Sequence, residues 1–143
     1  MSNRRALVIA TLAGSLCLGL VPARAGEFCL NAVVDADTNF FFHFQKKYST
    51  KPDKITPLNG KAIFLDGGLI QGLGPAYGEL LGLPEGDAGN SLGVTFTIGT
   101  SIGHAAIVLD DNGKMSGGGT VDFGGSSSSV SADIVDCATE PTP

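Results

Sequence analysis

The residues of this chain that could carry chemistry are three cysteines, two histidines and 14 acidic side chains. Cys29 and Cys137 stand near the two ends of the chain, whereas Cys17 lies in an apolar N-terminal stretch. In an exported protein, two cysteines at the two ends of a single domain are typical of a disulfide that connects the ends of the fold. We therefore predict a Cys29–Cys137 disulfide, whose paired sulfurs would be chemically inert.

Only two histidines are available for a catalytic or metal-binding role. A general base of the imidazole type, or a histidine-based metal site, must use His43 or His104. His43 lies in an aromatic segment and His104 follows a glycine, and nothing in their spacing brings them together. We expect each to be an exposed or hydrogen-bonded structural residue. A small periplasmic enzyme that uses His43 or His104 with an Asp is one alternative.

Other patterns that could indicate a site are incomplete. Residues 110–113 (Asp-Asp-Asn-Gly) offer oxygen ligands of the type that calcium prefers, but no glutamate stands at the twelfth loop position. The serine run at 126–129 has no G-x-S-x-G context, and the glycines at 117–119 precede Thr120 without the lysine of a phosphate loop. We therefore predict no catalytic residues, no metal site and no cofactor. Residues 110–113 are expected to form a tight hairpin with positive φ at Gly113.

The N-terminus has the three parts of an export signal. Arg4 and Arg5 precede an uncharged apolar stretch over residues 6–21, and Ala-Arg-Ala at 23–25 is a small-x-small cleavage site. We predict a signal peptide over 1–25, a single all-β domain over 26–137 and a flexible tail over 138–143. A twin-arginine signal is the alternative to an ordinary one. The protein would be periplasmic or secreted and would not span a membrane after cleavage.

The chain that remains after such a cleavage has a negative net charge. Three of the nine basic residues lie before residue 26, so six lysines face 14 acidic residues and the net charge falls near −8. Nucleic-acid binding depends on clustered Lys and Arg. We interpret the lysines between residues 46 and 61 as part of a solvated loop or edge strand and not as a binding patch. We expect no nucleic-acid partner.

Alternating apolar residues predict β-strands. Phe40, Phe42 and Phe44 share one face of an extended segment, and the same period of two runs from residue 92 to 98. Of the 21 glycines, 19 lie after residue 25, about twice the average share, which disfavours helices. Turns are expected at Asn59-Gly60 and at residues 66–68, and an irregular connection at Pro52 and Pro57. Further candidate strands cover residues 28–34, 62–65, 69–73, 76–81, 104–109, 114–123 and 130–137.

Seven or eight short strands joined by tight turns favour a small antiparallel up-and-down barrel, because closure removes exposed edges. A β-sandwich is the alternative. The glycines at 74, 78, 82 and 86 repeat like the small residues of packed membrane helices, but Pro75 and Pro84 interrupt them, and we predict a strand and a loop there. The chain has no tryptophan and two tyrosines, which argues against the aromatic girdles of an outer-membrane barrel.

The predicted interior suggests a binding role. We expect Phe40, Phe42 and Phe44 to point inward with Phe96, and we assign these four as candidate ligand-binding residues. The opposite face, with Phe41, His43 and Gln45, is expected to point outward and to leave Phe41 partly exposed. The favoured function is an exported, non-catalytic barrel that binds a small apolar ligand or a protein partner. The second is a structural or interaction protein of the cell envelope, with a barrel filled by its own side chains. An open lumen would favour the first and a filled lumen the second.

Overall fold

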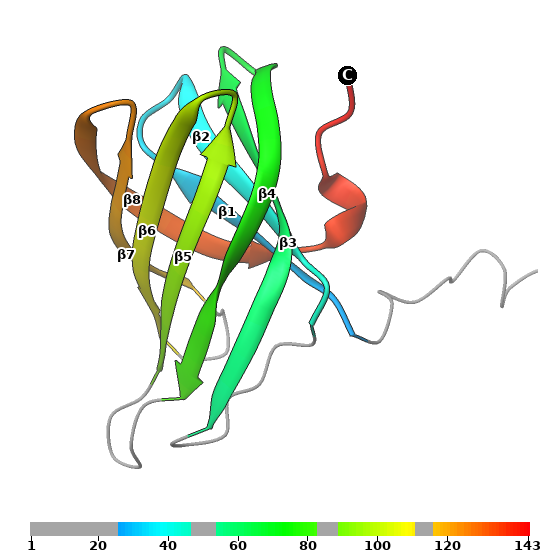
Figure 1. The fold of residues 1–143 in the computed structure, drawn as a ribbon, viewed down its shortest axis with the longest axis vertical. Helices are drawn as coiled ribbons and strands as arrows, with labels where there is room; N and C mark the ends of the chain where they lie inside the picture. Colours follow the sequence, from blue (N-terminus) through cyan, green and yellow to red (C-terminus); the bar gives the residue numbers. More distant parts are fainter. Residues whose placement is uncertain (1–25, 47–53, 83–88, 111–115) are drawn as a thin grey trace, which may run out of the picture.

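The computed structural model describes residues 26–46, 54–82, 89–110 and 116–143. They form a closed barrel of eight antiparallel strands, in which each strand pairs with the next and the last pairs with the first (Figure 1). This confirms the predicted all-β barrel over the sandwich. In chain order the elements are β1 Phe28–Val33, β2 Thr38–Phe44, β3 Ile55–Asp66, β4 Leu69–Gly82, β5 Asn90–Ile98, β6 Ser101–Leu109, β7 Ser116–Phe123, β8 Ser126–Val135 and a 3₁₀ turn, η1, Cys137–Thr139.

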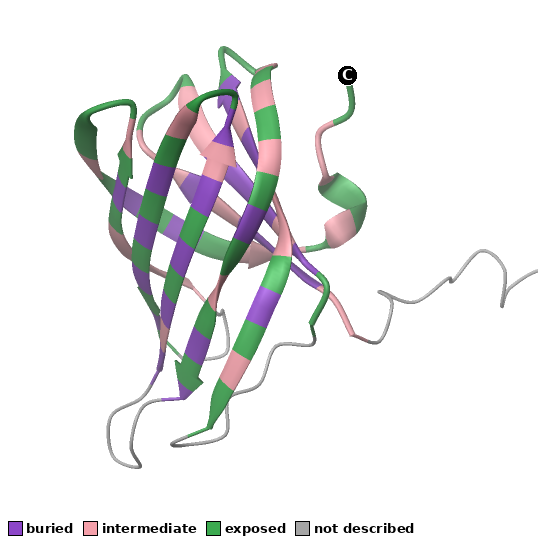
Figure 2. Ribbon diagram, in the orientation of Figure 1, coloured by how far each residue is buried: buried purple, intermediate pink, exposed green. Residues whose placement is uncertain are grey.

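The strands bury alternate residues, as the sequence period requires. Along β6 every second residue from Gly103 to Leu109 is buried and the residues between are exposed, and the same alternation is visible on several strands in Figure 2. In β2 the side chains of Phe40, Phe42 and Phe44 belong to the core inside the barrel. The predicted inward face of this strand is therefore correct.

Seven of the eight phenylalanines pack inside the barrel. The ring of Phe40 is central, with its centroid 5.0 Å from that of Phe64 and 5.5 Å from those of Phe96 and Phe123. Phe42 continues the packing toward the other end, 5.4 Å from Phe96. Offset and edge-on ring pairs at these separations stabilise a core beyond simple burial. The middle of the lumen is consequently filled by the protein's own side chains.

Glycines on β4 and β6 allow close packing of the barrel wall and its core. A Cβ on Gly74 would overlap the carbonyl oxygen of Thr97, and a Cβ on Gly78 would overlap that of Gly93. A Cβ on Gly103 of β6 would overlap the ring of Phe96. Gly74 and Gly78 of the four-residue glycine repeat thus mark inward-facing strand positions where the neighbouring backbone approaches closely.

The connections at one end of the barrel are short. Residues 67–68 join β3 to β4, and Gly67 and Gly68 have φ of 61° and 79°, which a type I′ hairpin requires. Gly124 and Gly125, with φ of 61° and 83°, join β7 to β8 in the same way. The predicted turn at residues 66–68 is correct. The predicted hairpin at 110–113 includes Gly113, which lies outside the described residues.

Two predicted breaks fall inside a strand instead. Asn59-Gly60 and Pro57 lie within β3, where Pro57 is paired with Glu79 and Gly60 with Ala76. A Cβ on Gly60 would overlap the carbonyl oxygen of His43 on β2. This glycine therefore serves a close approach between two strands, whereas the sequence motif alone is typical of a hairpin turn. The separate strands predicted at 69–73 and 76–81 likewise form one strand, β4.

The predicted disulfide is present and holds a second, smaller core outside the barrel. Cys29 of β1 and Cys137 of η1 are bonded across 108 positions of the sequence, with their Cα atoms 5.1 Å apart. Closing so long a loop stabilises the folded state by about 4–5 kcal/mol through lost chain entropy in the unfolded state. Beside the buried Cys29 lie the outward-facing side chains of Phe41, Ile63 and Leu65.

This small core corrects one prediction. Phe41 was expected to be partly exposed, yet only 3% of it is accessible. It packs in the same cluster as Cys29 and Cys137, and the disulfide holds η1 beside β1. A period of two assigns a residue to a face, but it does not reveal that a distant segment covers that face.

Among the described residues, no helix has the length and apolar character needed to cross a lipid bilayer.

A pair of alanine substitutions tests the role of the inward-facing glycines. We expect Gly78→Ala to lower the free energy of unfolding by about 2–3 kcal/mol, because the methyl group must displace the backbone of β5. Gly93→Ala is the matched control, since a Cβ there would meet nothing within 4 Å, and it should change stability by less than about 0.5 kcal/mol. Urea denaturation followed by circular dichroism measures both. Equal losses in the two variants would contradict this account of the glycines.

Candidate functional site

A small apolar recess lies at the end of the barrel that carries the short turns. Its volume is about 160 Å³. Rings line it on one side and hydroxyl groups on another, and the complete lining is Val34, Thr38, Phe40, Phe64, Val121, Phe123, Ser126 and Ser128. An apolar hollow with a few polar groups at the mouth of a β-barrel has the general character of a ligand pocket.

The turn between β1 and β2 shapes one wall of this recess. The Asp35 carboxylate accepts hydrogen bonds from the backbone N–H groups of Asp37 and Thr38, at 2.9 and 2.8 Å. These two bonds hold the pKa of Asp35 below its ordinary value of 3.8. The backbone N–H of Val34 in turn donates to the carbonyl oxygen of Thr38 at 2.9 Å. This closed turn fixes Val34 and Thr38, both of which line the recess.

The four residues proposed from sequence as a ligand site divide into two groups. Phe40 lines the recess directly. Phe96 touches Phe40 and Phe123, with centroids 5.5 and 5.7 Å away, and is 1% accessible. Phe42 and Phe44 are completely buried and stack on each other farther from the recess. Sequence reasoning missed Phe64 and Phe123 as lining residues, although each has the inward parity of a strand.

A second, shallower depression lies on the outer face of β4 and β5. It has a volume of about 530 Å³. Gly93 is opposite Glu79 in the strand register, so the absence of a side chain there lowers the surface between Ser91 and Thr95 of β5. Tyr77 is 60% accessible and Leu81 37%. Large exposed apolar side chains continue along β3 and β4 at Ile55, Leu69 and Leu73.

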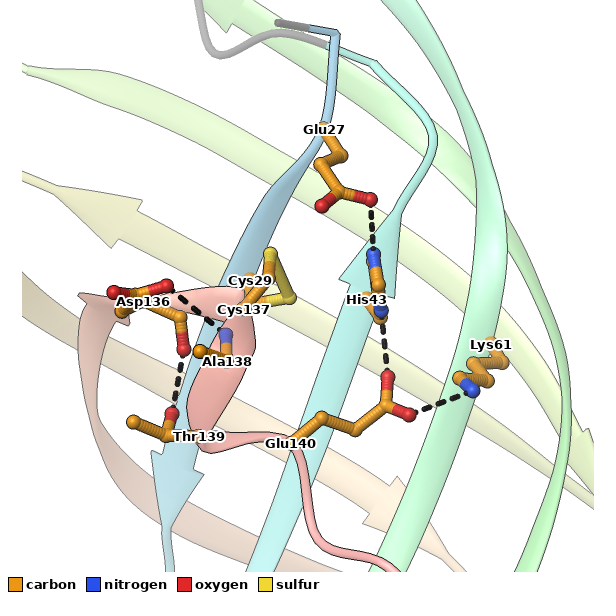
Figure 3. The surroundings of a disulfide bond; sticks show 9 residues. All are labelled: Glu27, Cys29, His43, Lys61, Asp136, Cys137, Ala138, Thr139 and Glu140. Atoms are coloured by element: carbon orange, nitrogen blue, oxygen red, sulfur yellow. Dashed lines mark hydrogen bonds and ion pairs between the residues drawn. A yellow bond between two sulfur atoms is a disulfide. The ribbon is translucent and has the colours of Figure 1, made fainter. Parts of the chain in front are cut away.

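The third feature is an ionic cluster beside the disulfide (Figure 3). His43 of β2 lies between two carboxylates: its Nε2 is 2.8 Å from Glu27, and its Nδ1 is 2.6 Å from Glu140. The other carboxylate oxygen of Glu140 accepts a hydrogen bond from Lys61 Nζ at 2.8 Å. Because ionised carboxylates only accept, both ring contacts are hydrogen bonds when the imidazole carries two protons. The cluster thereby joins both ends of the described chain to β2 and β3.

The setting of Glu140 affects its protonation. Partial burial acts to raise the pKa of Glu140, but the hydrogen bonds and positive charges of Lys61 and His43 outweigh it and hold the pKa below the ordinary value of 4.5. Glu140 belongs to the segment 138–143 that was predicted to be a flexible tail. The sequence could not indicate this pairing, since Glu140 and His43 are 97 positions apart.

His43 is hydrogen-bonded, which is one of the two settings expected for it. Its side chain points outward, as predicted, but is only 14% accessible because Glu27 and Glu140 cover it. His104 is exposed on β6, where its Nδ1 is 3.2 Å from Thr95 Oγ1. The histidines lie on different strands, and neither lines the recess or the outer depression.

Comparisons with protein families, with curated proteins and with solved structures find no match for this chain. The chemistry of its own surfaces and hollows therefore carries the functional argument.

The ionic cluster predicts unequal effects of removing the two histidines. We expect His43→Ala to lower the free energy of unfolding by about 1–3 kcal/mol, because it removes the hydrogen-bond donor of two partly buried carboxylate oxygens, one on Glu27 and one on Glu140. His104→Ala should change it by less than about 0.5 kcal/mol, because His104 is exposed. Guanidinium denaturation near neutral pH compares the two. A larger loss in His104→Ala would contradict the described cluster.

Replacing Glu140 should make stability depend differently on pH. Since the folded-state pKa is lowered, the carboxylate stabilises the fold above its unfolded value near 4.5, and this contribution is lost as the pH falls through the lower folded-state value. Glu140→Gln should therefore be about 1 kcal/mol less stable than the parent near neutral pH, with the gap closing in acid. Thermal unfolding at a series of pH values measures the gap. A gap that widens in acid would overturn the assigned sign.

Proposed function

We propose that this protein is an exported, non-catalytic β-barrel that binds a small apolar ligand of about one aromatic ring in the recess at its short-turn end. The recess lined by Phe40, Phe64 and Phe123 carries this proposal. The ligand site is narrower than the one expected from sequence, because Phe42 and Phe44 lie in the filled part of the lumen.

The volume of the recess sets the size of the ligand. An apolar cavity of about 150 Å³ lined by aliphatic and aromatic side chains is large enough to hold benzene, and the recess measures about 160 Å³. Larger ligand pockets have volumes of about 300–1,000 Å³, so a lipid or a pigment would not fit. The hydroxyls of Thr38, Ser126 and Ser128 could orient one polar substituent on the ring.

Export is supported by the disulfide. A bond that closes 108 positions persists in an oxidising compartment such as the periplasm or the extracellular medium. The arrangement of charged and apolar residues at 1–25 agrees with this location. The acidic balance of the chain after residue 25 gives no support to a nucleic-acid partner.

A second candidate function is protein interaction by a filled barrel of the cell envelope. The exposed apolar side chains of Ile55, Leu73, Tyr77 and Leu81 on β3 and β4 favour it, since exposed apolar surface is common where another protein docks. The enzyme alternative has less support. His43 is engaged by glutamates, not by an Asp, and neither histidine lines a described hollow.

Titration with toluene and indole tests the ligand proposal. We expect saturable chemical-shift changes in ¹³C NMR signals of Val34, Val121 and the three lining rings, with a Kd on the order of 1 mM, or about −4 kcal/mol. The Ser128→Leu variant should bind at least tenfold more weakly, because the new side chain fills the recess. Ser127→Leu is the matched control, since Ser127 is exposed on the same strand.

The outcome separates the two candidates. Loss of binding in Ser128→Leu but not in Ser127→Leu, with both variants folded by circular dichroism, is the predicted result. Equal binding by both variants, or shifts that never saturate, would contradict a ligand site in the recess. The filled barrel that binds through its outer surface would then be the better account.

A further inference from the structure

The disulfide and the ionic cluster together place three residues of metal-binding types close to one another. The sulfur atoms of Cys29 and Cys137 and a ring nitrogen of His43 all lie within 4.8 Å of one another. Figure 3 shows the disulfide beside His43, with Glu27 and Glu140 on the two sides of the imidazole. In the oxidised protein the sulfurs are bonded to each other, and only thiolates are effective metal ligands.

We propose that reduction of the Cys29–Cys137 disulfide converts this point into a Zn²⁺ site formed by the two thiolates and His43. Tetrahedral zinc with Zn–S bonds of about 2.3 Å and Zn–N bonds of about 2.0 Å places its ligand atoms about 3.5–3.8 Å apart. The sulfurs separate when their bond breaks, and the three ligand atoms already lie within 4.8 Å. Small side-chain rotations therefore suffice to reach this spacing.

The chemical step balances with a dithiol as the reductant. The dithiol passes two electrons and two protons to the protein disulfide, the S–S bond breaks, and the dithiol becomes a disulfide. Cys29 and Cys137 are then thiols. Zn²⁺ displaces their two protons into solvent and forms two Zn–S bonds. Cys137 is a half-buried residue whereas Cys29 is fully buried, so a small reductant would attack the disulfide from the side of Cys137.

The carboxylates around His43 complete the site. Zinc at one ring nitrogen must displace the glutamate that contacts that nitrogen, and this glutamate is then in place as the fourth ligand. The other glutamate keeps its hydrogen bond to the opposite ring N–H, which fixes the tautomer of a metal-bound histidine and raises its basicity. Lys61 interacts with the side of Glu140 that is turned away from the ring.

A zinc ion at this site would keep β1 and η1 connected after reduction has broken the disulfide between them. The disulfide joins β1 to η1, and zinc bound by Cys29, Cys137 and His43 would join β1, η1 and β2. Because zinc binding to thiolates contributes directly to folding free energy, the reduced protein would be stabilised by the metal. This inference does not depend on the apolar recess, which has no residue in common with the zinc site.

Cobalt titration of the reduced protein tests the proposal. The purified protein is reduced by a water-soluble phosphine without oxygen and titrated with Co²⁺ as a spectroscopic substitute for zinc. We expect one Co²⁺ per chain, with thiolate-to-cobalt charge transfer and tetrahedral ligand-field bands that Zn²⁺ abolishes. The oxidised protein should show neither signal. His43→Gln should weaken binding tenfold or more, while His104→Gln, which changes the chain's other histidine, should leave it unchanged.

The fold of the reduced protein is followed in parallel by circular dichroism. If reduction alone unfolds the barrel, Zn²⁺ should restore the β-sheet spectrum, and this result supports the site. A reduced protein that stays unfolded with saturating Zn²⁺ would overturn the proposal. So would a folded, reduced protein without charge-transfer bands, or equal Co²⁺ affinity of His43→Gln and His104→Gln.

Discussion

The volume inside a closed eight-stranded barrel is the constraint on which the rest of this structure depends. Seven phenylalanine rings enter that volume, so some of the other inward positions must be small. The inward side of β4 meets this need with Gly72, Gly74, Ala76 and Gly78, and Gly103 on β6 leaves space for the ring of Phe96. Large and small buried residues thereby fill the lumen, except at the short-turn end, where the recess remains.

The two ends of the barrel differ in the chemistry of their side chains. At the short-turn end, rings and hydroxyls surround a small apolar space. Toward the opposite end, on the outer face of β1, β2 and β3, a disulfide and four ionisable side chains connect the chain ends to the wall. A ligand bound in the recess would not contact this cluster, since they have no residue in common. The structure therefore allows a binding function at one end and a redox-dependent connection at the other.

Sequence reasoning worked where the relevant signal is local and failed where it is not. The inward face of β2 and the barrel itself follow from a period of two and from turn residues, and Cys29–Cys137 follows from counting. Asn59-Gly60 was assigned to a turn because a glycine required by the backbone of a neighbouring strand has the same sequence signature as a hairpin. The burial of Phe41 and the pairing of His43 with Glu140 were not predictable, since they depend on a segment almost 100 positions away.

The lumen is filled along its length by side chains and is open only at the short-turn end. A crystal structure of the protein under xenon pressure tests this most directly, because xenon enters dry apolar cavities of this size. The account predicts xenon between the rings of Phe40, Phe64 and Phe123 and none among Phe28, Phe42 and Phe44. Xenon bound deep in the lumen, or an empty recess, would contradict it.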